Sequence, residues 1–134
     1  MIYLDTSALV KLIVKEPETG ALRRFIAKAD PEMFVTSALS RAELFRVAIR
    51  QTEVSVLSKA KEVLDGVSEM TITQSLLETA GTVGPPHLRT LDAIHLVTAL
   101  EFGKELVAFV AYDTRLLAAA ELAGLPTVAP GMGR

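Results

Sequence analysis

The chain has 134 residues, of which 50% are hydrophobic and 22% are charged. This composition excludes a disordered or low-complexity protein, and the length predicts a single domain over residues 1–134 with a core of its own. The absence of cysteine excludes a disulfide scaffold, a thiolate zinc site and a thiol nucleophile. Sixteen acidic residues against 14 basic ones give a net charge of −2, which by itself argues against binding to phosphate backbones.

The N-terminal segment, Met1 to Asp5, has no basic region followed by a long apolar one, so we expect no signal peptide. No stretch approaches the roughly 18 apolar residues that a transmembrane helix needs. Together with the missing cysteines, these features predict a cytoplasmic protein that does not enter a membrane.

Short apolar runs alternate along the chain with segments whose apolar residues are three and four positions apart. The runs predict buried strands and the spaced segments predict helices. In chain order we expect a strand at 2–4 followed by a short helix, a helix around 22–29, a strand at 33–35, helices around 39–49 and 54–64, a strand at 70–72, a helix around 88–98, a strand at 106–111, a helix around 116–123 and a strand at 127–129. This order predicts an α/β fold, a three-layer α/β/α sandwich with a central, mainly parallel sheet.

Two acidic residues directly follow predicted strands. Asp5 comes after the first strand, and Asp113 follows the run at 106–111 after Tyr112. Ligands of open α/β sheets bind at the carboxyl ends of the strands, which is where these carboxylates would lie. Each aspartate also precedes a predicted helix, so each could instead serve as an N-cap.

Two further acidic residues, Glu43 and Asp92, lie on or beside the apolar stripes of predicted helices. A charge on such a face costs several kcal/mol unless it is paired or bound to a cation. Arginine partners such as Arg46 or Arg89, the favourable helix dipole for Asp92, or a raised pKa are alternatives.

If Asp5, Glu43, Asp92 and Asp113 converge above the sheet, their repulsion requires a counter-charge. Mg²⁺ or Mn²⁺ suits a site made only of oxygen ligands, and such sites hydrolyse phosphate esters. No phosphate-binding loop, zinc motif or serine nucleophile elbow competes with this interpretation. His95 shares a face with Asp92 and is expected to be a packed, hydrogen-bonded core residue; orienting Asp92 or contacting substrate is the alternative.

Basic residues lie near each of these acids, and an aromatic residue precedes Asp113. Ordinary solvated charge explains most surface arginines, but groups beside a metal could hold a nucleic-acid backbone, and a tyrosine could stack on a splayed base. The candidates for RNA contact are Lys11, Arg46, Arg89, Arg115 and Tyr112. For Tyr112, packing in the core is the alternative.

Four segments of the chain resemble, in order and at the expected spacing, the four motifs of the PIN-domain ribonucleases. They are residues 4–12 (LDTSALVKL), 36–44 (TSALSRAEL), 88–96 (LRTLDAIHL) and 111–116 (AYDTRL). Within that family the sequence is most similar to the VapC-type toxins of VapBC toxin–antitoxin modules. The resemblance covers essentially the whole chain.

The resemblance implies a PIN-like fold and a Mg²⁺- or Mn²⁺-dependent endoribonuclease, the toxin of a type II toxin–antitoxin system. It carries the catalytic and metal-binding acids over to Asp5, Glu43, Asp92 and Asp113, and implies that Thr6 or Ser7 fixes the carboxylate of Asp5. It also implies a homodimer and a cognate VapB-type antitoxin, through which alone DNA would be bound. Many relatives carry a further acid or amide where this chain has Thr114-Arg115, which makes the fourth ligand position the weakest match.

Two other functions remain as alternatives. One is a non-enzymatic PIN-like interaction module, and the other, less favoured, is a receiver-type phosphoacceptor domain, which needs paired acids after the first strand. The net charge does not decide between them, because setting aside the four proposed ligands leaves 12 acidic residues against 14 basic ones. The remainder of the chain would then be mildly basic.

Overall fold

A computed structural model describes residues 1–133. Five parallel strands form one sheet in the order β3-β2-β1-β4-β5. The strands are β1 (Ile2–Leu4), β2 (Phe34–Ser37), β3 (Ser68–Met70), β4 (Ala108–Val110) and β5 (Thr127–Val128). The prediction of one domain over residues 1–134 stays a prediction, since residue 134 lies outside the described part.

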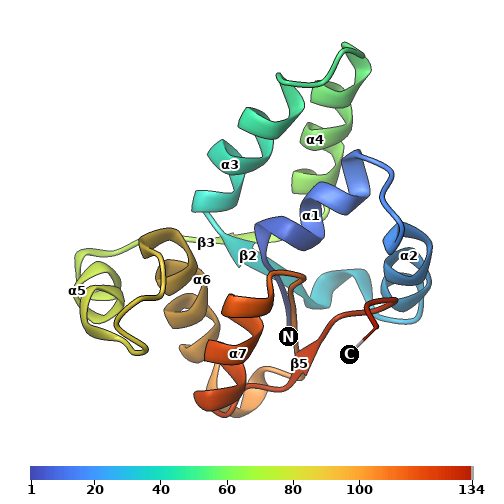
Figure 1. The fold of residues 1–134 in the computed structure, drawn as a ribbon. Coiled ribbons are helices and arrows are strands. Elements are labelled where there is room, and N and C mark those ends of the chain that lie inside the picture. The colour runs from blue at the N-terminus through green and yellow to red at the C-terminus, as the bar shows by residue number, and fades with distance from the viewer. Residues whose placement is uncertain (134) are drawn as a thin grey trace.

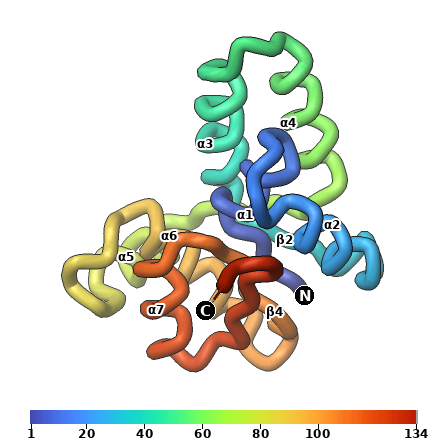
Figure 2. The backbone as a smooth tube through the Cα atoms, turned by 45° about the vertical axis from the view of Figure 1, so that its right-hand side comes forward, coloured from blue at the N-terminus to red at the C-terminus, as the bar shows by residue number. Residues whose placement is uncertain are grey.

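Helices connect the strands and cover both faces of the sheet (Figure 1). They are α1 (Thr6–Ile13), α2 (Thr19–Ala27), α3 (Leu39–Ala48), α4 (Ser55–Asp65), α5 (Gln74–Thr82), α6 (Thr90–Leu100) and α7 (Thr114–Leu122), with short 3₁₀ turns η1 (Pro31–Met33) and η2 (Gly103–Glu105). In both Figure 1 and Figure 2, α3 and α4 form a pair that projects away from the sheet.

Alternating strand residues build two separate cores, because successive side chains of a strand point to opposite faces. Ile2 and Leu4 of β1 pack with α1, α2, α3 and α4. Tyr3, between them, packs on the other face with α6 and α7. A third apolar cluster joins α5 to α6. The predicted three-layer α/β/α sandwich with a parallel sheet is therefore confirmed.

The boundaries of several predicted elements were wrong by one or two residues. The second strand begins at Phe34, because the side chain of Asp30 accepts from Glu32 N and starts the η1 turn that takes up Met33. The third strand is Ser68–Met70, not 70–72, and the long run at 106–111 contributes only Ala108–Val110. Helix α5 was not predicted; only Leu76 and Ala80 of it are buried, so its apolar pattern is weak.

Two apolar residues within the predicted helices at 54–64 and 88–98 are exposed to solvent. Val54 is 90% exposed at the start of α4, where the α3–α4 pair extends beyond the sheet, and Leu91 is 46% exposed in the first turn of α6. No helix among residues 1–133 has the length and apolar character needed to cross a membrane.

The topology places the predicted site residues at one edge of the sheet. β1 is the central strand and pairs with β2 on one side and β4 on the other. The carboxyl ends of these three strands therefore lie together, and Asp5 N donates to Val110 O at the end of β4. Asp5, the start of α3 and the turn leading to α7 all leave the sheet at this edge.

Candidate metal centre

Asp5 is 4% exposed and caps helix α1. Its Oδ1 accepts hydrogen bonds from Ser7 Oγ at 2.6 Å and from the backbone N of Ala8 at 3.0 Å. Burial raises the pKa of Asp5 to about 6; the charge of Asp92 adds to the rise, while His95, Ser7 and Ala8 oppose it. The N-cap alternative is thus realised, yet the second oxygen of Asp5 receives no hydrogen bond from residues 1–133.

Glu43 is held on α3 by two donors that meet at the same oxygen. Thr6 Oγ1 donates to Oε1 at 2.5 Å, and His95 Nε2 lies 2.9 Å from it. Burial raises the pKa of Glu43, but these hydrogen bonds outweigh burial and hold the pKa below its usual value. The partner of this inward-facing acid is therefore a histidine and a threonine, and not Arg46, which is exposed.

Asp92 lies half-buried in the first turn of α6. Burial and then the neighbouring charge of Asp113 raise its pKa, while Arg89 and His95 oppose the rise. No side chain or backbone group of residues 1–133 donates a hydrogen bond to this carboxylate. The raised pKa expected as one alternative for Asp92 is therefore present.

Asp113 caps helix α7 with one oxygen and faces Arg89 with the other. Oδ1 accepts from the backbone N of Arg115 at 2.9 Å and of Leu116 at 3.1 Å. Oδ2 lies 3.9 Å from a guanidinium nitrogen of Arg89, too far for a hydrogen bond. Asp113 therefore caps a helix with one carboxylate oxygen only, as Asp5 does.

Three of the four predicted acids line one pocket of about 250 Å³, which we call the acidic pocket. Its lining residues are Glu43, Arg89, Thr90, Leu91, Asp92 and Asp113. Asp5 is not part of its lining but is electrostatically coupled to Asp92. Within residues 1–133, no three His, Asp or Glu side chains stand in an arrangement that could hold a metal ion as they are placed. Glu43, Asp92 and Asp113 share one pocket without converging on one point.

Thr6 and Ser7, the two hydroxyl residues after Asp5, form hydrogen bonds to different acids. Ser7 donates to Asp5 and accepts from the backbone N of Tyr112 at 2.9 Å, which ties the start of α1 to the end of β4. Thr6 bonds Glu43 instead. The side chain that fixes Asp5 is therefore Ser7.

Tyr3 is a contributor to the site that the sequence interpretation missed. Its hydroxyl lies 2.7 Å from His95 Nδ1, and both side chains are buried. Burial raises the pKa of Tyr3 well above its usual value, so the phenol keeps its proton. A tyrosine in a strand predicted to be buried on both faces needs a polar partner, which is the signal that could have identified it. His95 is the packed core residue we expected, but it contacts Glu43 as well.

The five candidates for RNA contact are placed differently. Arg46, Arg89 and Arg115 are exposed, the last two beside the acids. Lys11 is buried, forms ion pairs with Glu16 and Glu18 at 3.3 and 2.9 Å, and lies over the ring of Tyr112. The hydroxyl of Tyr112 donates to Pro130 O at 2.8 Å. These contacts favour the packing alternative for Tyr112 and give Lys11 a structural task.

The chain is similar to known proteins in both sequence and fold. A family model for the PIN domain matches residues 2–122. Ribonuclease VapC47 of Mycobacterium tuberculosis is 43% identical over 136 residues, covering 100% of both chains. Ribonuclease VapC46 of the same species is 42% identical over 129 residues, covering 96% of this chain and 97% of the relative.

Two solved structures share the fold. The crystal structure of M. tuberculosis VapC20, described as a sarcin–ricin loop cleaving toxin, has a TM-score of 0.75 at 21% identity and covers 97% of this chain and 100% of that one. FitAB bound to a DNA fragment has a TM-score of 0.71 at 16% identity and covers 100% of this chain and 98% of that one. At these identities the two structures support the fold alone. Together with the full-length sequence matches, the findings show that the chain belongs to the PIN-domain family and, within it, to the VapC ribonucleases.

Proposed function

We propose that this chain is a Mg²⁺- or Mn²⁺-dependent endoribonuclease, the toxin of a type II toxin–antitoxin module, and that Asp5, Glu43, Asp92 and Asp113 form its catalytic centre. The observation that carries this proposal is the acidic pocket, into which α3, α6 and the turn before α7 each contribute one carboxylate. Asp5 does not line this pocket but is coupled to Asp92 by charge.

The donor set fits a divalent cation. Each of the four carboxylates keeps at least one oxygen that accepts no hydrogen bond from residues 1–133, while the bonded oxygens of Asp5, Glu43 and Asp113 are fixed by local donors. Hard cations of this kind prefer carboxylate oxygens and tolerate several in one site. Glu43, Asp92 and Asp113 would have to rotate to converge on one ion with the second oxygen of Asp5, a movement that is fast for groups at a pocket surface; Asp5 itself stays fixed by Ser7 and Ala8.

The four residues would divide the work as follows. Asp5 and Asp92 would be the principal ligands, and Asp113 would lie close to the ion through its Oδ2. When bound, the cation lowers the pKa of a coordinated water and stabilises the charge that develops on the phosphate. Glu43 is ionised at neutral pH because its pKa is lowered, and its Oε2 is available to orient the attacking water.

The expected binding partners of this chain are inferred from its relatives. The VapC20 structure is that of a toxin, and the FitAB structure contains DNA. We expect this chain to bind a cognate VapB-type antitoxin, to form a homodimer, and to reach DNA only through the antitoxin. RNA would be held beside the acids by Arg89 and Arg115, with Arg46 further along α3; Lys11 and Tyr112 are poorly placed for this task.

The test is RNA cleavage by purified protein. With Mg²⁺ or Mn²⁺, wild-type protein is expected to cut a structured RNA, and EDTA is expected to stop the reaction. Asp5→Asn should abolish cleavage, whereas Asp30→Asn, which alters an exposed aspartate at η1, should leave it unchanged. Cleavage by Asp5→Asn protein that is free of contaminating nuclease would contradict the proposal. Absence of Mn²⁺ binding to the wild type in calorimetry would favour the non-enzymatic module instead.

A further inference from the structure

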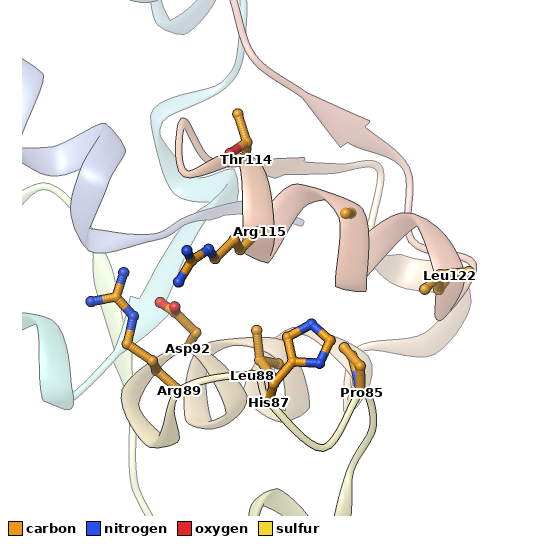
Figure 3. Close-up of a pocket in the computed structure, with 9 residues that line it drawn as sticks. Pro85, His87, Leu88, Arg89, Asp92, Thr114, Arg115 and Leu122 are labelled. Carbon is orange, nitrogen blue, oxygen red and sulfur yellow. The ribbon is translucent and has the colours of Figure 1, made fainter.

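A second pocket, of about 310 Å³, opens beside the acidic pocket between α7 and the segment that leads into α6 (Figure 3). We call it the side pocket. Its walls are formed mainly by apolar groups, among them Pro85, Leu88, Ala118 and Leu122. Leu122 is 82% exposed, an unusual position for a leucine whose side chain lines a hollow. The volume is at the lower end of the range found for small-molecule sites.

The side pocket adjoins the acidic pocket. Arg89 and Asp92 line both of them. In Figure 3, the side chains of Arg89 and Arg115 lie on either side of Asp92, and His87 stands further along, facing α7. A bound molecule with its phosphate at Asp92 would therefore lie between the two guanidinium groups and place its next group in the apolar side pocket.

This combination of groups selects a particular chemistry. The arginines favour a negative charge at the mouth, and the apolar walls favour a flat, weakly polar group inside. A nucleotide carries both features at adjacent positions. Unstacked RNA bases stack on histidine rings and on guanidinium planes, and the exposed ring of His87 and the two arginines supply such surfaces.

We infer that the side pocket is a subsite for one unpaired nucleobase of the RNA substrate, adjacent to the phosphate that is cleaved. The inference rests on the proposed ribonuclease function and adds to it a means of choosing the cleavage site. It assigns His87 to base stacking and Arg115 to the neighbouring phosphate. An apolar segment of a partner protein, or a second copy of this chain, would also bury Leu122, but neither explains why the hollow opens onto Asp92 between two arginines.

Two pairs of variants test the subsite. Ala118→Trp fills the side pocket from α7, and its control, Ala123→Trp, places the same ring at an exposed position on the end of that helix, outside the pocket. Leu122→Glu puts a negative charge at the mouth, and its control is Val54→Glu at the residue that precedes α4. All four positions are exposed, so each variant is expected to fold, which thermal melting checks.

Two measurements are made on each protein. One is the affinity for a short fluorescent single-stranded RNA with Ca²⁺ in place of Mg²⁺, which reports binding without relying on cleavage. The other is the mapping of cut ends in a pool of randomised single-stranded RNA with Mn²⁺. We expect Ala118→Trp and Leu122→Glu to weaken binding about tenfold or more, the amount that one stacked base contributes, and to remove the base preference at one position beside the cut. His87→Ala should weaken the same preference, and both controls should match wild type.

The outcomes separate the two proposals. If wild type cuts RNA and Ala118→Trp and Leu122→Glu retain its affinity and its base preference, the subsite is wrong and the ribonuclease proposal stands. If RNA binding depends on the side pocket but no cut appears, base binding in the side pocket stands and the proposed catalysis is wrong. The variants could instead change the oligomeric mass measured by sedimentation, or lose antitoxin binding while RNA binding stays intact. Either result would overturn the subsite in favour of a protein that occupies the side pocket.

Discussion

The Nε2 atom of His95 lies 2.9 Å from Oε1 of Glu43. Glu43 is an acceptor because its pKa is lowered, so Nε2 must carry a proton. The other ring nitrogen, Nδ1, lies 2.7 Å from the hydroxyl of Tyr3, which is its hydrogen-bond partner. A phenol buried in the central strand thus fixes the histidine that orients an acid of the proposed catalytic centre.

Tyr3→Phe tests this chain of hydrogen bonds. The change removes one hydroxyl and leaves His95 Nδ1 without its hydrogen-bond partner in a buried place, which is expected to cost about 1–3 kcal/mol of unfolding free energy. Because Glu43 is then less firmly oriented, we expect RNA cleavage to fall by about tenfold, the lower end of the range for groups that support metal ligands. Urea unfolding and a cleavage assay with Mn²⁺ measure the two effects.

The matched control for this change is Thr19→Val. It removes a buried hydroxyl that donates to Lys11 O and accepts from Glu16 N, in a different polar contact of the fold. It is expected to lower stability while leaving cleavage unchanged. Equal losses of activity in both variants would mean that Tyr3 supports the fold and does not act on Glu43.

The raised pKa of Asp5 predicts how the stability of the metal-free protein depends on pH. Its pKa is about 6 in the folded protein and 3.8 in the reference state, so folding binds a proton between these values. Stability from this group is present below about pH 4 and is lost as the pH rises through 6, by about 3 kcal/mol in total. The Asp5→Asn variant has no ionisable group at this position, so its stability should not fall in this way as the pH rises.

The measurement is chemical unfolding in EDTA at pH 4 and at pH 7. Wild type and Asp5→Asn should have similar stability at the lower pH, and Asp5→Asn should be the more stable protein at the higher pH. The opposite difference at pH 7 would show that the carboxylate is stabilised where it stands and that the acids are not crowded.

The sequence predicted the layers of the fold because short apolar runs and helical stripes report burial directly. It predicted Asp5 and Asp113 at one edge because parallel strands end together. It did not predict that each acid uses one oxygen as a helix cap and keeps the other available, since capping and ligation were treated as competing alternatives. Helix α5 was missed because it buries little, and the contact from Tyr3 to His95 joins residues 92 positions apart, which no local pattern reports.

Asp92→Asn tests whether the acids share a metal ion. The carboxylate is half-buried and repelled by Asp113, so its removal is expected to raise the melting temperature in EDTA. Added Mn²⁺ at about 100 times its dissociation constant should stabilise wild type by about 2.7 kcal/mol and should stabilise Asp92→Asn much less. Asp65→Asn, at an exposed position at the end of α4, serves as the control and should respond to Mn²⁺ like wild type. A lower melting temperature of Asp92→Asn in EDTA would contradict the crowding of the acids.

Replacing Arg89 tests whether its guanidinium binds an RNA phosphate or serves only as the partner of Asp113. Its guanidinium is exposed and stands 3.9 Å from Asp113 Oδ2, so Arg89→Ala should change the unfolding free energy by less than about 0.5 kcal/mol. If Arg89 contacts a phosphate, the same change weakens RNA binding and lowers the slope of log affinity against log salt by about one. Arg41→Ala is the matched control, because Arg41 is an exposed arginine whose guanidinium is held by both carboxylate oxygens of Glu69. Affinity measured over a series of salt concentrations checks the prediction. An unchanged slope in Arg89→Ala would mean that the arginine serves to neutralise Asp113, and that the phosphates are held by other groups at the mouth of the acidic pocket.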